Sequence, residues 1–147
     1  MRARIIGVLT LMLLAVTLGP PVLADQTAPL GESDRAAIRG VIENQIAAFR
    51  REDGAAAFAY AAPSIQAQFG DPAQFMEMVR RGYQPVYHPN HVTFGELSQH
   101  DNLVVQSVEV VGADGAPATA LYFMEHEPDG TWRISGCVLL GAQSVGA

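Results

Sequence analysis

Apolar side chains recur at intervals of three and four residues over positions 34–53, with charged side chains between them. This spacing places the apolar side chains on one face of a helix. Ser33 or Asp34 can cap the start of that helix, and Gly54 is typical of the residue just after a helix end. The pattern predicts an amphipathic helix whose apolar face is formed by Ile38, Val41, Ile42, Ile46 and Phe49.

Alanine, proline and aspartate mark the expected helices of the next part of the chain. An alanine-rich stretch over 55–62 predicts a short second helix that Pro63 stops. Asp71 and Pro72 are typical of a helix start, with aspartate at the N-cap and proline in the first turn. Residues 83–90 contain two prolines, which predicts an extended and irregular segment.

The hydrophobic pattern changes to alternation near residue 91, and the change persists almost to the end of the chain. Runs of β-branched and aromatic residues are separated there by short turns. Such runs predict four strands paired as an antiparallel meander. Because the helices come first and the strands second, the expected fold class is α+β, with N-terminal helices packed on the sheet. The predicted strands cover residues 91–97, 103–111, 118–126 and 131–140.

The turn at residues 128–130 predicts a register for the last two strands. Its sequence, Pro-Asp-Gly, suits a three-residue hairpin loop. That loop places Glu125 opposite Arg133 and, further along, Leu121 opposite Cys137. The other face, which is apolar, should receive the helices. Its predicted pairs are His126 with Trp132, Met124 with Ile134, Tyr122 with Gly136, and Ala120 with Val138.

The opposite face of this hairpin is more apolar than a solvent-facing sheet should be. In the predicted register it carries Leu121, Phe123, Cys137 and Leu139. We therefore expect a partner to cover it, most simply a second copy of the chain. The sequence predicts a homodimer formed through Leu121, Phe123 and Leu139.

The beginning of the chain has the three parts of an export signal. Arg2 and Arg4 precede an apolar run over 5–18, which is followed by helix-breaking residues and small side chains ending at Ala24. The run is shorter than the roughly 20 residues of a membrane span, although an uncleaved anchor is the alternative. We expect a protein exported to the periplasm or secreted, without a membrane anchor after cleavage. The predicted organisation is a signal peptide (1–24), a flexible leader (25–33), one α+β domain (34–141) and a C-terminal tail (142–147).

The charge of the exported chain limits its partners. Loss of Arg2 and Arg4 leaves seven basic against fifteen acidic residues, a net charge of −8, and the chain contains no lysine. Nucleic acids and anionic membrane surfaces both attract a positive surface. We therefore expect no nucleic-acid partner and no membrane partner.

Cys137 is the only cysteine, so an intramolecular disulfide is impossible. Its environment favours a small buried hydrophobic role, and a reactive thiol or an intermolecular bridge is the alternative. The sequence contains no phosphate-binding loop, dinucleotide-binding glycine pattern or zinc-ligand spacing. We expect no cofactor.

Two short motifs resemble the nuclear transport factor 2-like and cystatin-like superfamily. Residues 46–58 resemble its first helix and the turn that follows, and residues 129–134 resemble its closing hairpin with the pattern D-G-x-W-x-I. The exported part of the chain more specifically resembles a secreted bacterial family, domain of unknown function 4864. The resemblance implies export and a cone-shaped α+β fold with a pocket, but no activity. The matching segments of that family are residues 69–72, 83–87 and 132–139.

A fold of this type encloses a pocket between its helices and the concave sheet, and aromatic residues are candidates for its lining. Ordinary core packing is the alternative for each of them. Together they predict a non-catalytic module that binds a small apolar ligand, or a protein partner, with tyrosine hydroxyls as the polar groups. The candidate ligand-binding residues are Phe58, Tyr60, Phe69, Tyr83, Tyr87, Tyr122 and Trp132.

A small enzyme of ketosteroid isomerase-like type is the alternative function, because enzymes on this fold use a carboxylate or histidine base in an apolar pocket. His126 is a weak catalytic candidate, and the other possible bases have simpler structural roles. His88 and His91 could begin a metal site, but nothing in the sequence places further ligands near them. We expect no metal. The remaining candidate bases are Asp53, Asp71 and Glu125; the remaining possible metal ligands are His100, Asp101 and His126.

Overall fold

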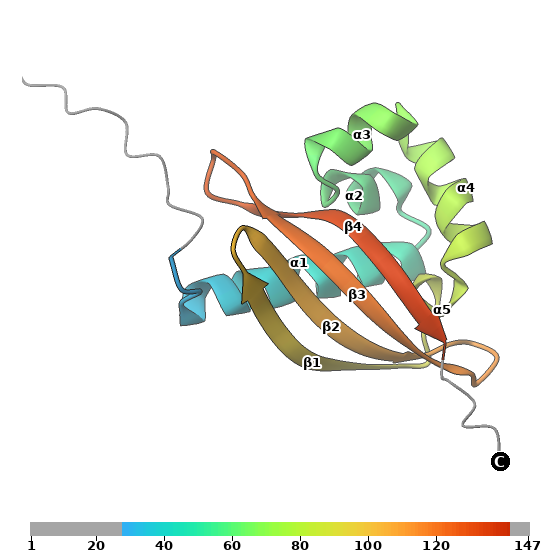
Figure 1. The fold of residues 1–147 in the computed structure, drawn as a ribbon. Helices are drawn as coiled ribbons and strands as arrows, with labels where there is room; N and C mark the ends of the chain where they lie inside the picture. The colour runs from blue at the N-terminus through green and yellow to red at the C-terminus, as the bar shows by residue number, and fades with distance from the viewer. Residues whose placement is uncertain (1–27, 142–147) are drawn as a thin grey trace, which may run out of the picture.

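A computed structural model describes residues 28–141 as five helices followed by a four-stranded antiparallel sheet (Figure 1). The fold is therefore α+β, with the predicted order of elements. The predicted signal peptide and C-terminal tail lie outside the described residues, as does the first part of the predicted leader. Within residues 28–141, no helix is long and apolar enough to cross a membrane.

Helix α1 (Glu32–Arg50) is the predicted amphipathic helix, but both of its ends differ from the predicted range of 34–53. It begins two residues before position 34, because the Asp34 carboxylate accepts a hydrogen bond from the Gly31 amide at 3.2 Å. It ends before position 53, because Glu52 adopts a left-handed conformation with φ of 57°. Asp53 then caps the next helix, α2 (Gly54–Ala59), by accepting a hydrogen bond from the Ala56 amide. Gly54 therefore begins α2 instead of following α1.

The remaining helices, α3 (Pro63–Phe69), α4 (Pro72–Gly82) and α5 (Gln84–Tyr87), each have a proline in the first turn. Asp71 caps α4 as predicted, accepting a hydrogen bond from the Gln74 amide at 2.9 Å. Pro63, which was predicted to stop the second helix, instead begins α3. Pro85, which was predicted to lie in an extended segment, is in the first turn of the single-turn helix α5. The predicted extended segment at 83–90 is thus partly helical, because proline is tolerated in a first turn that needs no amide donor.

The sheet has the strand order β1-β2-β3-β4, so the predicted meander is confirmed. The predicted bounds differ mainly for β1, which continues three residues beyond Leu97. The strands are β1 (His91–His100), β2 (Leu103–Val111), β3 (Pro117–His126) and β4 (Trp132–Gly141).

The register of β3 and β4 agrees with the prediction only near the turn. Glu125 pairs with Arg133 as expected, but an irregularity follows between residues 134 and 136 of β4. An extra residue on one strand moves every later side chain to the opposite face. Beyond it, Tyr122 pairs with Cys137, and Ala120 pairs with Leu139. The predicted pairs Leu121–Cys137, Tyr122–Gly136 and Ala120–Val138 are therefore wrong.

The register shift changes the composition of both faces. Cys137 and Leu139, predicted on the outer face, pack against the core beneath the helices. Val138 instead lies beside Leu121 on the outer face and is 44% exposed. Gly136 there leaves room for the Phe123 ring, whose Cδ2 would lie 3.5 Å from an added Cβ. In Figure 1, α1 crosses behind the sheet, and no described helix covers the face turned toward the viewer.

The homodimer stays a prediction, with Leu139 removed from its surface. Leu121 and Phe123 remain on the outer face, and Val138 adds to them. Light scattering at high micromolar concentration should report a dimer, and Val138→Asp should shift the protein toward monomer by placing a charge in an apolar contact. A wild-type protein that stays monomeric at that concentration would contradict the dimer.

Two groups of buried side chains form the core. The first lies between α1 and the sheet and includes Ile42, Val108 and Ile134. The second joins α1, α2, α4 and α5, and is built around Phe49 and Phe75. Residues from both groups line a cavity between the helices and the sheet.

Candidate functional site

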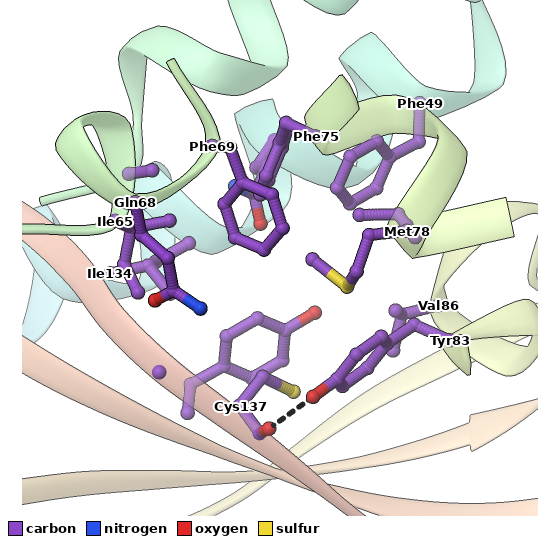
Figure 2. Close-up of a pocket in the computed structure, with 15 residues that line it drawn as sticks. Phe49, Ile65, Gln68, Phe69, Phe75, Met78, Tyr83, Val86, Ile134 and Cys137 are labelled. Atoms are coloured by element: carbon purple, nitrogen blue, oxygen red, sulfur yellow. Dashed lines mark hydrogen bonds between the residues drawn. The ribbon is translucent and has the colours of Figure 1, made fainter. Parts of the chain in front are cut away.

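A cavity of about 430 Å³ lies between the helices and the last two strands of the sheet (Figure 2). Helix α4 provides one wall through its apolar face, and β4 provides part of the other. Most of the lining side chains are aliphatic or aromatic. The lining residues from α4 are Phe75, Met78 and Val79; those from β4 are Ile134, Cys137 and Gly136, which has no side chain.

The β4 irregularity determines which groups reach the cavity. In a regular strand Ile134 and Cys137, three positions apart, would point to opposite faces. The extra residue between them brings both to the helix-facing side, where both line the cavity. Tyr122 of β3 is the pairing partner of Cys137 and lines the cavity as well.

Four polar side chains of the lining differ in how their hydrogen bonds are satisfied. The Tyr83 hydroxyl donates to the Cys137 backbone carbonyl at 3.0 Å, as Figure 2 shows. The Gln45 amide donates to the Ala57 carbonyl at 3.1 Å, and Gln68 is exposed. The Tyr122 hydroxyl is buried and has no hydrogen-bond partner among the described residues.

Burial keeps the ionisable groups of the lining neutral. Burial raises the pKa of the Cys137 thiol to about 12. Burial, and secondarily the neighbouring thiol, raises the pKa of Tyr122 well above its ordinary value of 10.0, and the pKa of Tyr83 rises for the same reasons. The raised values leave all three groups protonated near neutral pH.

A known protein family matches nearly all of the described residues. The family model described as a domain of unknown function, DUF4864, matches residues 31–147. The chain belongs to the DUF4864 family. A comparison with curated proteins gives no match.

Three of the seven predicted ligand-binding residues of this DUF4864 domain line the cavity: Phe69, Tyr83 and Tyr122. Phe58 belongs instead to the second core group, with its ring centroid 5.4 Å from that of Phe75. Tyr60 follows α2, and its backbone carbonyl accepts a hydrogen bond from the Ile134 amide.

The other two predicted residues also lie away from the cavity lining. Tyr87 packs in the second core group, and its hydroxyl donates to the Glu52 carboxylate. That hydrogen bond is the main reason why the pKa of Glu52 is lowered. Trp132 stacks on His126 and donates to the Asp34 carboxylate at 3.2 Å. Trp132 thereby joins the start of α1 to the start of β4.

The candidate bases of the DUF4864 domain occupy structural positions outside the cavity lining. Asp53 and Asp71 cap α2 and α4. Glu125 pairs across the hairpin with Arg133, and His126 lies at the end of β3, stacked on Trp132. Among the described residues, no aspartate, glutamate or histidine lines the cavity.

The candidate metal ligands His88, just after α5, and His91, the first residue of β1, do not gather further ligands in the described part of the chain. His88 contacts the Glu52 carboxylate at 2.9 Å through its Nε2 atom. Between residues 28 and 141, no group of three or more histidine, cysteine, aspartate or glutamate side chains is placed to hold a metal ion.

Several lining residues were missed by the sequence prediction, for two reasons. Phe49 was visible as a member of the apolar face of the first helix, but the prediction treated that face as core alone. Cys137 was placed on the wrong face, because the β4 irregularity has no signal in the hydrophobic alternation. The pairing of Tyr122 with Cys137 is what brings the thiol to the cavity.

Proposed function

We propose that this DUF4864 protein is an exported, non-catalytic module that binds a small apolar ligand in the cavity. The observation that carries the proposal is a cavity of about 430 Å³ with a neutral lining of mainly apolar side chains. Small-molecule sites in proteins are typically roughly 300–1,000 Å³, apolar, and equipped with a few polar groups. The cavity has that size and that composition.

The same proposal includes the fold type, nuclear transport factor 2-like, and the export of the protein from the cell. Helices that precede a four-stranded meander, with a cavity between them, support a cone-shaped arrangement of the nuclear transport factor 2-like type. The charged start, apolar run and small residues at the beginning of the sequence support export through a cleaved signal.

Binding is favoured over catalysis by the chemistry of the lining. A ketosteroid isomerase-like reaction uses a carboxylate or imidazole base that reaches the substrate. The described lining has neither, and its tyrosines and thiol hold their protons because burial raises their pKa values. Catalysis of such a reaction would therefore need a base from outside the described cavity lining.

The neutral fluorophore N-phenyl-1-naphthylamine provides a direct test. Titration into the purified protein is expected to give a saturable fluorescence increase, with a dissociation constant on the order of 1–100 μM. An apolar cavity produces this signal because the probe leaves water. Denatured protein serves as the control and should give no saturable signal. A signal that rises linearly with probe concentration would contradict a defined site.

A further inference from the structure

We infer that the ligand is a neutral molecule with an accepting oxygen, such as a ketone or ester carbonyl, and that the Tyr122 hydroxyl donates a hydrogen bond to it. This inference rests on the proposed binding function and adds the chemical class of the ligand.

The Tyr122 hydroxyl is an exception among the buried polar groups of the described structure. The side chains of Gln45 and Gln106 are also buried, but their amides donate to backbone carbonyls. Tyr122 is only 1% exposed, and its hydroxyl has no partner between residues 28 and 141. The other unpartnered buried atom, on Glu127, belongs to the hairpin turn and not to the cavity lining.

A buried hydroxyl without a partner is unfavourable in a folded protein. Because Tyr122 lines the cavity, a bound ligand is a natural source of the missing partner. The neighbouring Tyr83 hydroxyl has no such need, because it already donates to the Cys137 carbonyl. The cavity lining therefore includes one tyrosine whose hydroxyl is satisfied and one whose hydroxyl has no partner among the described residues.

The unsatisfied hydroxyl calls for an accepting atom on the ligand. Tyr122 retains its proton, since burial raises its pKa, and a phenol offers one O–H donor. The Cys137 side chain that pairs with it across the strands is also protonated. The tyrosine and the thiol thus present protons and no negative charge to the ligand.

The same lining argues against a charged head group inside the cavity. A ligand carboxylate would lose its hydration without gaining a counter-charge, because no arginine, lysine or histidine of the described chain lines the cavity. A ligand ammonium group would likewise find no carboxylate. A neutral carbonyl or ether-type oxygen satisfies Tyr122 without that desolvation cost.

Two fluorescent probes of similar body and different head group test this inference. Prodan is a naphthyl ketone, whereas N-phenyl-1-naphthylamine has no carbonyl. Tyr122→Phe is expected to weaken prodan binding about fivefold, the typical contribution of one hydrogen bond. It should change the affinity for the naphthylamine less than about twofold. In the Tyr122→Phe variant, the emission of bound prodan should shift to shorter wavelength than in the wild-type protein, because the prodan carbonyl loses its hydrogen-bond donor.

A matched variant separates this role from a structural one. Tyr83→Phe removes a hydroxyl from the same cavity, but one that already has a partner. It should lower the thermal midpoint and leave the ratio of the two probe affinities unchanged. Tyr122→Phe should keep or raise the thermal midpoint without ligand, because the hydroxyl it removes has no partner in the described structure.

The outcomes distinguish this inference from the function on which it rests. Selective loss of prodan binding in Tyr122→Phe supports the assignment. If the wild-type protein binds neither probe at a saturable site, the proposed function fails and the inference fails with it. If both probes bind and Tyr122→Phe weakens them equally, or affects neither, the ligand class is wrong while the binding site stands.

Discussion

Replacing Met78 with tryptophan is expected to raise the dissociation constant of the naphthylamine probe at least 30-fold, which corresponds to a loss of about 2 kcal/mol. Met78 lies on the cavity side of α4, and Figure 2 shows its thioether reaching toward the middle of the lining residues. The larger indole would occupy space that the ligand needs. Because Met78 is only partly buried and adjoins the cavity, the fold should accommodate it at small cost. Probe titration and circular dichroism measure the two effects.

The matched control for this variant is Ala73→Trp. Ala73 lies on the same helix, is exposed, and is not part of the cavity lining. The Ala73→Trp substitution introduces the same indole side chain without filling the cavity, and it should leave probe binding unchanged. Undiminished binding in a folded Met78→Trp protein would show that the probe binds elsewhere.

Alkylation of Cys137 by N-ethylmaleimide is expected to be at least about 20-fold slower in the native protein than for a free cysteine at about pH 8. With a pKa of about 12, the thiolate fraction of the folded protein is roughly a thousandfold below that of an unperturbed thiol. A thiolate of higher pKa is intrinsically more nucleophilic, and this offsets roughly 15- to 60-fold of the difference. Mass spectrometry at timed intervals measures the rate.

The pH dependence of the same reaction separates a raised pKa from simple shielding. The native rate should continue to rise about tenfold per pH unit between about pH 8 and 10, whereas a free thiol levels off near pH 9. Protein unfolded in denaturant is the control and should react like a free thiol. A native rate that levels off near pH 9 would contradict the raised pKa.

The raised thiol pKa also makes the folded state less stable in alkaline solution. Burial disfavours the thiolate, so the unfolded chain releases this proton at a lower pH than the folded chain does. The stability is therefore fully present below the ordinary thiol pKa, and is lost as the pH rises from there toward about 12. Slow alkylation and alkaline destabilisation have the same cause.

The sequence by itself determined the helices α1, α2 and α4, the four strands, and their order. The three-and-four spacing of α1, the Asp71-Pro72 start of α4 and the alternation of the four strands follow from local chemistry. Each element has one apolar face that must be buried. The same logic predicted that Tyr122 faces the helices, and the structure places it there, 1% exposed.

Helix ends and the single turn α5 were decided by interactions that a periodic pattern does not contain. The left-handed backbone at Glu52 and the capping of α2 by Asp53 depend on how the chain turns between two packed helices. The single turn α5, which contains Pro85, is helical although its proline-rich sequence favours an extended backbone. The packing of the neighbouring Val86 and Tyr87 side chains into the two core groups accompanies that conformation.

The contents of the cavity were decided by tertiary structure. One extra residue in β4 brings Cys137 to the side of the sheet that also holds Ile134, and it turns Val138 outward. A strand irregularity leaves the alternation of apolar residues intact on either side, so the sequence reads as a regular strand through it. Pairing with β3 and the packing of the helices select the shifted register, because hydrophobic burial depends on which face a side chain occupies. The apolar cavity, whose lining includes Tyr122 with a hydroxyl that has no partner within residues 28–141, therefore exists only in the folded chain.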